Sequence, residues 1–531
     1  MPVLEEAVIF CEAPASKGQP ATRVLDSSEI ELSCRAKVDT TTRKGQIGEE
    51  STRTPTHPEA RAECRKLLRM LYNSRRPSTH SGPVTTLARK LRATDYFTLG
   101  WGTMVGVGWL VVMDDWLTRG GALGTALGFV LGGALLVPIG WAYGKLVVTM
   151  PDAAGEIAYT TAIFPRVVSF ATGWMMTLAY FIVCPWEAVA FGRIAAYILP
   201  ALDRWELYRV AGRPVFLPHL VVGLVLTAVL TVLNYRGVRL SATFQNWTTF
   251  GTLALFAVFV VLGAGRGSSA NVAPLFTHTP LVSILLVIQI VPYFMTGFES
   301  VGKAAEEASP DFPAQGFVRA IWMAIFIGIL FYASIVAAVA FVAPWHSLIG
   351  EKFMTAVAFR HALGSRWIVN IILAAALLSL FKCFNGNFVA ATRLFFALGR
   401  RGMILAPAGA IHARFQTPSA AVVWVGLATA ACMLLGDAIL VPVTEVGSVA
   451  CAVGWAATCA ACIAIAFFRP EIIRLSPTEY GVAGFGLVVA LAMILMKVVP
   501  AVPGHFTVSE WLALGAWVLL GAVAAISKRW G

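Results

Sequence analysis

Long apolar segments, each about as long as a lipid bilayer is thick, recur through this sequence from Tyr96 onward. A helix needs about 20 consecutive, mostly apolar residues to cross the hydrocarbon core. Of the 531 residues, 57% are hydrophobic and 13% are charged, whereas an ordinary soluble chain is about 25% charged. The sequence therefore predicts an all-α integral membrane protein, with the lipid bilayer as its main partner.

The apolar segments predict twelve transmembrane helices, and an even number returns both termini to the same side. Lysine and arginine flank the spans mainly on the side of the N-terminal tail, except in the loop at 201–213. The positive-inside rule then places both termini in the cytoplasm, and we expect the plasma membrane. The predicted spans are 95–113, 121–147, 167–199, 214–234, 245–264, 279–303, 319–343, 366–398, 418–436, 439–467, 478–499 and 507–527.

The segment 1–93 is polar, with mixed charges and Thr/Ser/Pro clusters, and it predicts a disordered basic cytoplasmic tail. Much of the net charge of +12 lies there and in short loops between spans. Basic segments beside a membrane are explained by anionic lipid, so we expect no nucleic-acid partner. The histidines fall outside the apolar spans or near their ends, and the sequence predicts no metal site and no cofactor.

Glycines crowd the first span, between Gly100 and Trp109. Each glycine costs a helix up to about 1 kcal/mol relative to alanine, so we interpret the run as a helix broken around Gly106–Gly108. The free N–H groups and the positive helix end there suit a carboxylate at the bilayer midplane. The alternative is close helix packing through the GxxxG pair Gly102 and Gly106.

The sixth span offers a second interruption. Pro292 and Gly297 weaken the helix, and the acid Glu299 follows directly. Interrupted segments at corresponding places in two halves of a chain are typical of inverted-repeat transporters, whose substrate site lies between the breaks.

Five motifs in order make this chain similar to the amino acid–polyamine–organocation (APC) superfamily over residues 93–470. They lie in the first helix, at the end of the second, at the entry to the fifth, around the sixth and at the end of the eighth. The motifs are Gly102–Gly108, Tyr143–Tyr159, Asn234–Arg239 with Gln245 and Asn246, Gly297–Pro310, and Asn385–Gly402.

The resemblance implies a five-plus-five inverted repeat (LeuT-like) with broken helices 1 and 6 and two added C-terminal helices. It divides the chain into the tail at 1–93, a first repeat at 94–270, a second repeat at 271–470 and a final pair of helices at 471–531. It also implies alternating access around one central site for a small-molecule substrate, without covalent chemistry.

In that superfamily, backbone amides of the first helix bind the substrate carboxylate, and carbonyls of the broken helices bind its amine. Carried over, the carboxylate subsite is Gly106, Val107 and Gly108. The amine subsite is formed by the carbonyls of Phe294, Met295 and Thr296. The resemblance implies aromatic gates at Trp109 and Phe298.

Ionisable side chains inside spans are functional candidates, because a charge there costs several kcal/mol. Glu187 is a candidate contact for a cationic substrate group. The candidates for coupling or gating are Glu299, Lys382, Asn385 and Glu445. The alternative for the charged residues is a structural ion pair, for Lys382 with Glu187 or Glu445.

A departure from the superfamily concerns its fifth-helix lysine, which lies near the cation position of sodium-coupled relatives. Thr252 stands at that position in this chain. We hypothesise that Lys382 of the eighth helix supplies the positive charge instead, in place of sodium, and exchanges a coupled proton.

The sequence thus favours a secondary active transporter of amino acids, a symporter or exchanger, over an enzyme. Two alternatives remain open: a transporter of polyamines or other cationic amines, and a transport-incompetent nutrient sensor that signals through the tail.

Overall fold

Apolar composition over long stretches produces a mostly helical structure. The computed structural model describes residue 87 and residues 89–527, so nearly all of the predicted tail lies outside the described residues. Within the described part, nine helical stretches are long and apolar enough to cross a membrane. Backbone groups have no water to bond in lipid, and a helix satisfies them internally.

Residues 89–266 form nine α-helices, some of them only one or two turns long, and one pair of strands. They are α3 (Ala93–Met104), α4 (Gly108–Val111), α5 (Met113–Leu135), α6 (Val137–Thr149), α7 (Glu156–Thr161), α8 (Arg166–Phe181), α9 (Val183–Ile198), β1 (Glu206–Val210), β2 (Arg213–Phe216), α10 (Leu217–Arg236) and α11 (Val238–Arg266).

The second half of the described chain is helical throughout, apart from its loops and short 3₁₀ turns. Its helices are α12 (Pro280–Ile288), α13 (Val291–Met295), α14 (Ser300–Lys303), α15 (Gln315–Val342), α16 (Met354–Leu363), α17 (Arg366–Arg400), α18 (Ser419–Cys432), α19 (Leu440–Phe468), α20 (Pro477–Val498) and α21 (Val508–Ser527).

The first predicted span ends too early in the sequence-based prediction. Helix continues past residue 113 to Gly120, and the direction changes at Gly121, whose φ of 72° suits a residue without a side chain. Within the extension, Asp115 forms an i,i+4 ion pair with Arg119 at 2.8 Å. The predicted start of the second span, residue 121, coincides with this turn.

The prediction of an all-α chain has an exception between α9 and α10. Strands β1 and β2 pair antiparallel there, joined by Ala211 and Gly212, which both have positive φ (48° and 77°). Two-residue turns with positive φ match the twist of paired strands.

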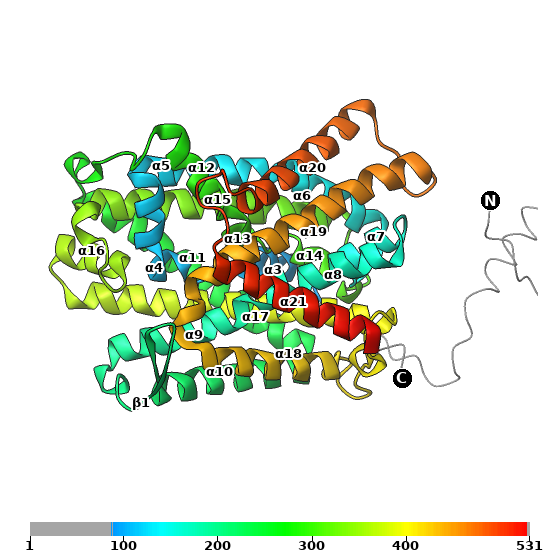
Figure 1. Cartoon of the computed structure of the whole chain (residues 1–531), viewed down its shortest axis with the longest axis horizontal. Coiled ribbons are helices and arrows are strands. Elements are labelled where there is room, and N and C mark those ends of the chain that lie inside the picture. The colour runs from blue at the N-terminus through cyan, green and yellow to red at the C-terminus, as the bar shows by residue number, and fades with distance from the viewer. Residues whose placement is uncertain (1–86, 88, 528–531) are drawn as a thin grey trace, which may run out of the picture. The chain divides into compact units, whose positions relative to one another are not determined.

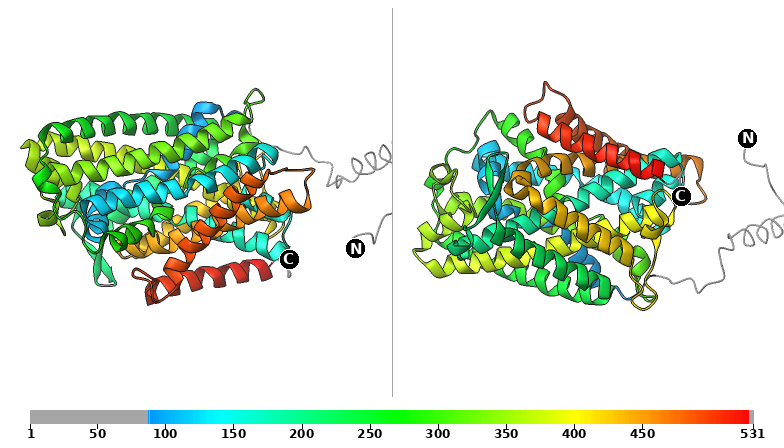
Figure 2. Two further views of the ribbon diagram at one scale, coloured as in Figure 1. Left: turned by 90° about the horizontal axis from the view of Figure 1, so that it is seen from above. Right: turned by 60° about the horizontal axis from the view of Figure 1, so that its bottom comes forward.

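Helix α3 lies in the interior, packed against α11, α15 and α17. In Figure 1, the β-hairpin and α16 lie at one end of the helices, and α7 and the turn between α19 and α20 lie at the opposite end. Helix α21 is peripheral, as both views of Figure 2 show. It is held partly by stacking of Trp517 on Trp174, with ring centroids 4.7 Å apart.

Candidate functional site: two helix breaks around a central cavity

The first break separates α3 from α4. Helix α3 ends at Met104, Val105 adopts extended angles (φ −96°, ψ 97°), and α4 begins at Gly108. The interruption predicted around Gly106–Gly108 is therefore present and starts slightly earlier. Such a break exposes carbonyl and N–H groups that an intact helix would bond internally.

Helix α17 supplies donors for the carbonyl groups of this break. Ser379 Oγ lies 3.1 Å from the Val105 carbonyl oxygen and 2.7 Å from that of Gly106. Lys382 Nζ also donates to the Val105 carbonyl and lies 4.6 Å from the centroid of the Trp101 ring. Lys382 is fully buried, so its charge is balanced by a carbonyl dipole and an aromatic face.

Helix α9 supplies the acceptor for the N–H groups. The Val107 N–H donates to Glu187 Oε1 at 3.3 Å, and Glu187 is only 1% exposed. A Cβ added to Gly106 would collide with the Glu187 carboxylate and with Cys383. The Glu187 side chain therefore occupies the place beside these amides that was predicted for the substrate carboxylate.

The second break, between α13 and α14, is satisfied mostly from within. Gly297 has a φ of 135°, which only glycine adopts readily. The Glu299 carboxylate accepts from Thr296 Oγ1 at 2.5 Å and from the Gly297 N–H at 3.0 Å. Trp455 Nε1 of α19 adds a third bond at 3.2 Å. Glu299, predicted as a gating acid, caps its own break.

The two breaks touch each other. A Cβ at Gly297 would collide with the backbone of Met104, so a side chain there is excluded. Tyr332 of α15 reaches both breaks, its hydroxyl lying 3.2 Å from the Met104 carbonyl oxygen and 2.8 Å from that of Phe294. One hydroxyl has a single proton to donate, so Tyr332 can bond only one of them at a time.

A small cavity of about 20 Å³ is lined by residues of both breaks. A volume of roughly 10–15 Å³ holds one water molecule, so the cavity has room for one group of that size. Its lining includes five of the predicted site residues, namely Gly106, Gly108, Glu187, Phe294 and Thr296. It also includes Trp186, Tyr293, Cys383 and Asn387, which the sequence reasoning missed.

The predicted aromatic gates lie elsewhere. Trp109 packs near Phe259 and Phe331, with centroids 6.3 and 6.5 Å away. Phe298 packs between Tyr143 and Trp455, at 5.8 and 5.7 Å. The carbonyl of Phe294, predicted for the amine, lies within hydrogen-bond distance of the Tyr332 hydroxyl, at 2.8 Å. Met295 is fully buried, with its methyl group close to Gly133.

Asn385 joins a polar cluster with α10 and α11. Its side-chain oxygen accepts from Asn234 at 2.9 Å and Ser241 at 3.1 Å, and its amide donates to Gln245 at 2.9 Å. The Asn385 oxygen therefore uses both of its lone pairs, and the amide uses one N–H, in hydrogen bonds that link α17 to α10 and α11.

Glu445 pairs with Arg119 at 3.0 Å and with the buried Lys497 of α20. Among the ion pairs of residues 89–527, none joins Lys382 to Glu187 or Glu445. The alternative of a fixed bridge for Lys382 therefore has no partner within 4 Å in this structure.

A spacing signal marks the residues of α17 that the sequence reasoning missed. Ser379, Lys382, Cys383, Gly386 and Asn387 follow the i, i+3, i+4, i+7, i+8 pattern of one helix face. This face meets the first break: Asn387 Nδ2 donates to the Thr103 carbonyl at 2.9 Å. Polar residues at that spacing in an apolar span are a recognisable signal.

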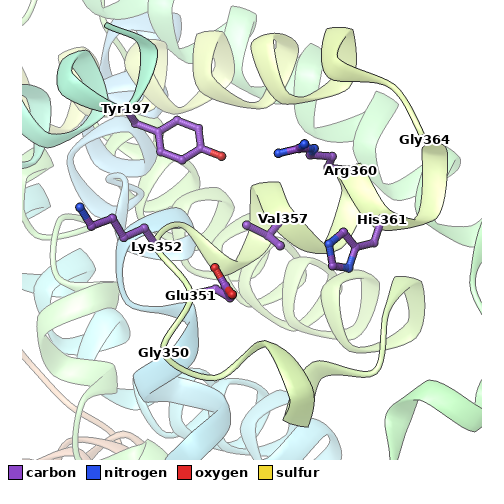
Figure 3. A pocket seen from close by; sticks show the side chains of 8 residues that line it. All are labelled: Tyr197, Gly350, Glu351, Lys352, Val357, Arg360, His361 and Gly364. Atoms are coloured by element: carbon purple, nitrogen blue, oxygen red, sulfur yellow. The ribbon is translucent and has the colours of Figure 1, made fainter. Parts of the chain in front are cut away.

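A larger cavity, of about 730 Å³, lies away from the breaks, beside α16. In Figure 3, the Tyr197 hydroxyl and the Arg360 guanidinium point toward one another across it, and Glu351 lies on another wall. Helix α16 also contacts α4, since Thr355 Oγ1 donates to the Trp109 carbonyl at 2.7 Å. This cavity therefore lies beside α16, the helix that packs on α4, and not at the central site.

A group of ion pairs lies near α7, at the end of the helices opposite to α16 (Figure 1). Arg400 bonds Glu306 at 2.5 Å and Asp152 at 3.3 Å, and the buried Lys303 pairs with Glu156 at 2.7 Å. Burial opposes ionisation of Glu306, but hydrogen bonds and charge from Arg400 outweigh it and hold the Glu306 pKa below its usual value. Among the described residues, no cluster of His, Cys, Asp or Glu suits a metal ion.

Comparisons with known proteins agree with this architecture. Residues 92–523 match the family described as amino acid permease. A methylthioribose transporter of Bacillus subtilis is 25% identical over 63% of this chain and 72% of its own length. A branched-chain amino acid permease of the same organism is 22% identical over 82% and 92%. A vacuolar cationic amino acid transporter of Arabidopsis thaliana is 23% identical over 74% and 66%.

Proposed function

Because the chain belongs to the amino acid permease family, we propose that it is a secondary active transporter of amino acids or related organic amines that works by alternating access. The observation that supports this mechanism is the small cavity lined by two adjoining helix breaks. Broken helices present backbone charge to a substrate at the bilayer midplane. An integral membrane protein with such a site can move a solute without covalent chemistry.

The proposed topology has twelve spans, a five-plus-five inverted repeat and two added helices, with both termini in the cytoplasm. In support, the two breaks fall at corresponding places in the two halves of the chain. We propose the plasma membrane as the location. The distribution of lysine and arginine supports the orientation.

For coupling, we propose that Lys382 replaces a sodium ion beside the first break. Its Nζ bonds the Val105 carbonyl, a group exposed by the break, as a bound cation would. Thr252 holds its hydroxyl in its own helix, 2.8 Å from the Thr248 carbonyl. Transport would then be independent of sodium, with a proton exchanged at Lys382.

The three relatives are named for the transport of methylthioribose, of branched-chain amino acids and of cationic amino acids. At 22–25% identity they do not single out one substrate. The acid Glu187 beside the break favours the second candidate of the sequence analysis, a cationic amine.

Uptake by the purified full chain in liposomes tests the proposal. A panel of radiolabelled amino acids and amines is offered with and without a sodium gradient and a pH gradient. We expect saturable uptake that does not require sodium. Sodium-driven uptake would contradict the role of Lys382, and binding without any uptake would favour a sensor.

A further inference from the structure

Three residues that line the central cavity each have a buried polar side-chain atom without a hydrogen-bond partner. The atoms are Glu187 Oε2, the Tyr293 hydroxyl and Asn387 Oδ1. Glu187 and Asn387 are at most 1% exposed, and Tyr293 is 5% exposed. An unpaired buried polar group costs about 1–3 kcal/mol, so three around one cavity indicate a ligand that pairs with them.

The chemistry of these atoms selects a donor. A carboxylate oxygen and an amide oxygen only accept hydrogen bonds, and a phenol does either. The three unpaired atoms therefore suit a group with several N–H donors.

The walls of the cavity suit a positive charge. Aromatic rings of Trp186, Tyr293 and Phe294 line it, with the Tyr293 centroid 6.5 Å from Trp186 and 5.1 Å from Phe294. Ring faces attract cations, most strongly in a desolvated site. An ammonium group, about the size of a water molecule, matches the volume of about 20 Å³.

The position expected for a substrate carboxylate is occupied. The Val107 N–H already bonds Glu187, whose carboxylate lies against Gly106. A substrate carboxylate at these amides would have to displace the Glu187 carboxyl group or lie against it. An amine without a carboxylate has no such conflict and can donate to the unpaired Oε2 of Glu187.

We propose that the central cavity binds the ammonium group of an organic amine that carries no carboxylate, with Glu187 as its counter-ion and Tyr293 and Asn387 as further acceptors. This inference rests on the proposed transport function and names its substrate class. Glu187 Oε1 stays on the Val107 N–H, and Oε2 accepts from the ammonium.

Matched pairs of probes test the inference on the purified full chain. Isoamylamine is compared with L-leucine, phenethylamine with L-phenylalanine and cadaverine with L-lysine, by titration calorimetry and by liposome uptake. We expect at least one amine to bind ten-fold or more tightly than its amino acid. Equal or tighter binding of every amino acid overturns the inference, as does the absence of any binding.

The two measurements separate this inference from the transport function. Uptake of amino acids without amines leaves the transport function intact and overturns the inference. Amine binding without uptake supports the inference and contradicts the transport function.

Variants connect the result to the cavity. Glu187→Gln keeps an acceptor for the Val107 N–H but removes the charge, so amine affinity should fall at least ten-fold while amino acid affinity does not fall. Tyr293→Phe removes one acceptor, with a loss of a few-fold, and serves if Glu187→Gln does not fold. Glu471→Gln, at an exposed position, is the matched control and should change neither affinity. Unchanged amine affinity in both cavity variants overturns the inference.

Discussion

Both helix breaks interrupt a membrane-buried helix, but their backbone groups are hydrogen-bonded in different ways. The break between α3 and α4 is held by Glu187 of α9 and by Ser379 and Lys382 of α17. The break between α13 and α14 is held mainly by Glu299, which lies within the break itself. A break capped from within can move as a unit, whereas one capped by neighbouring helices must exchange those bonds if it moves.

The difference assigns separate roles to two buried acids that look alike in the sequence. Glu299 accepts three bonds and completes a local backbone shape. Glu187 lines the cavity, accepts from the Val107 N–H through Oε1, and keeps Oε2 without a partner. The first break is therefore the adaptable partner, and Tyr332, within reach of carbonyls on both breaks, connects its state to that of the second.

The largest effect should come from filling the space between the breaks. A Cβ at Gly108 would lie 2.6 Å from the Phe294 ring, and overpacking of this kind costs about 1–3 kcal/mol. We expect Gly108→Val to lower liposome uptake at least ten-fold with near-normal surface expression. The control is Gly484→Val on α20, where a Cβ meets nothing within 4 Å. Equal losses in both variants would mean that the first break has no special role.

Two buried lysines give the next comparison. Lys497 has a carboxylate partner in Glu445, and removing one member of such a pair costs about 3–5 kcal/mol. We expect Lys497→Met to express poorly and Glu445→Gln to restore expression in the double variant. Lys382→Met should instead express well, bind substrate and lose turnover, as measured by binding and uptake on the same preparation. Rescue of a poorly expressed Lys382→Met by Glu187→Gln would show that Lys382 is a fixed structural charge.

The two acids sharpen the comparison directly. In Glu299→Gln, an amide N–H₂ replaces one oxygen and faces donors, so about 1–3 kcal/mol of stability should be lost. Glu187→Gln retains its single acceptor role and should lower the melting temperature less. Thermal unfolding of both purified variants measures the difference. A larger drop for Glu187→Gln would reverse the roles that the hydrogen bonds indicate.

Sequence reasoning locates the breaks but not their supports. Gly106 and Gly297 mark the weak points because helix formation depends on local backbone preferences. Buried charge is costly, and this alone singles out Glu187, Glu299 and Lys382. The capping of the first break by Glu187 depends on packing between segments 80 residues apart, which no local pattern encodes.

The gating role predicted for Glu299 illustrates the limit. Its carboxylate is used up by residues two and three positions away, a local geometry that follows from the φ of Gly297. The polar face of α17 is different, because the spacing of Ser379, Lys382 and Asn387 can be recognised in the sequence. The first break and its contacts with α17 could therefore be predicted in part from the sequence. The contact with Glu187 of α9 could not.

The smallest effect should come from changing Glu306, in the group of ion pairs that follows α14. Glu306 is about one quarter exposed and is bonded to Arg400, and such pairs contribute at most about 1 kcal/mol. Its pKa is lowered in the folded protein, so its contribution is complete above the unfolded value of about 4.3 and is lost as the pH falls through the folded pKa. Glu306→Gln should therefore lower the melting temperature by only a degree or two at pH 7, and the difference from the unmodified protein should shrink as the pH drops below 4. Glu471→Gln supplies the control. A loss at pH 7 as large as that of Glu299→Gln would show that the second break depends on its charged end and is not supported from within.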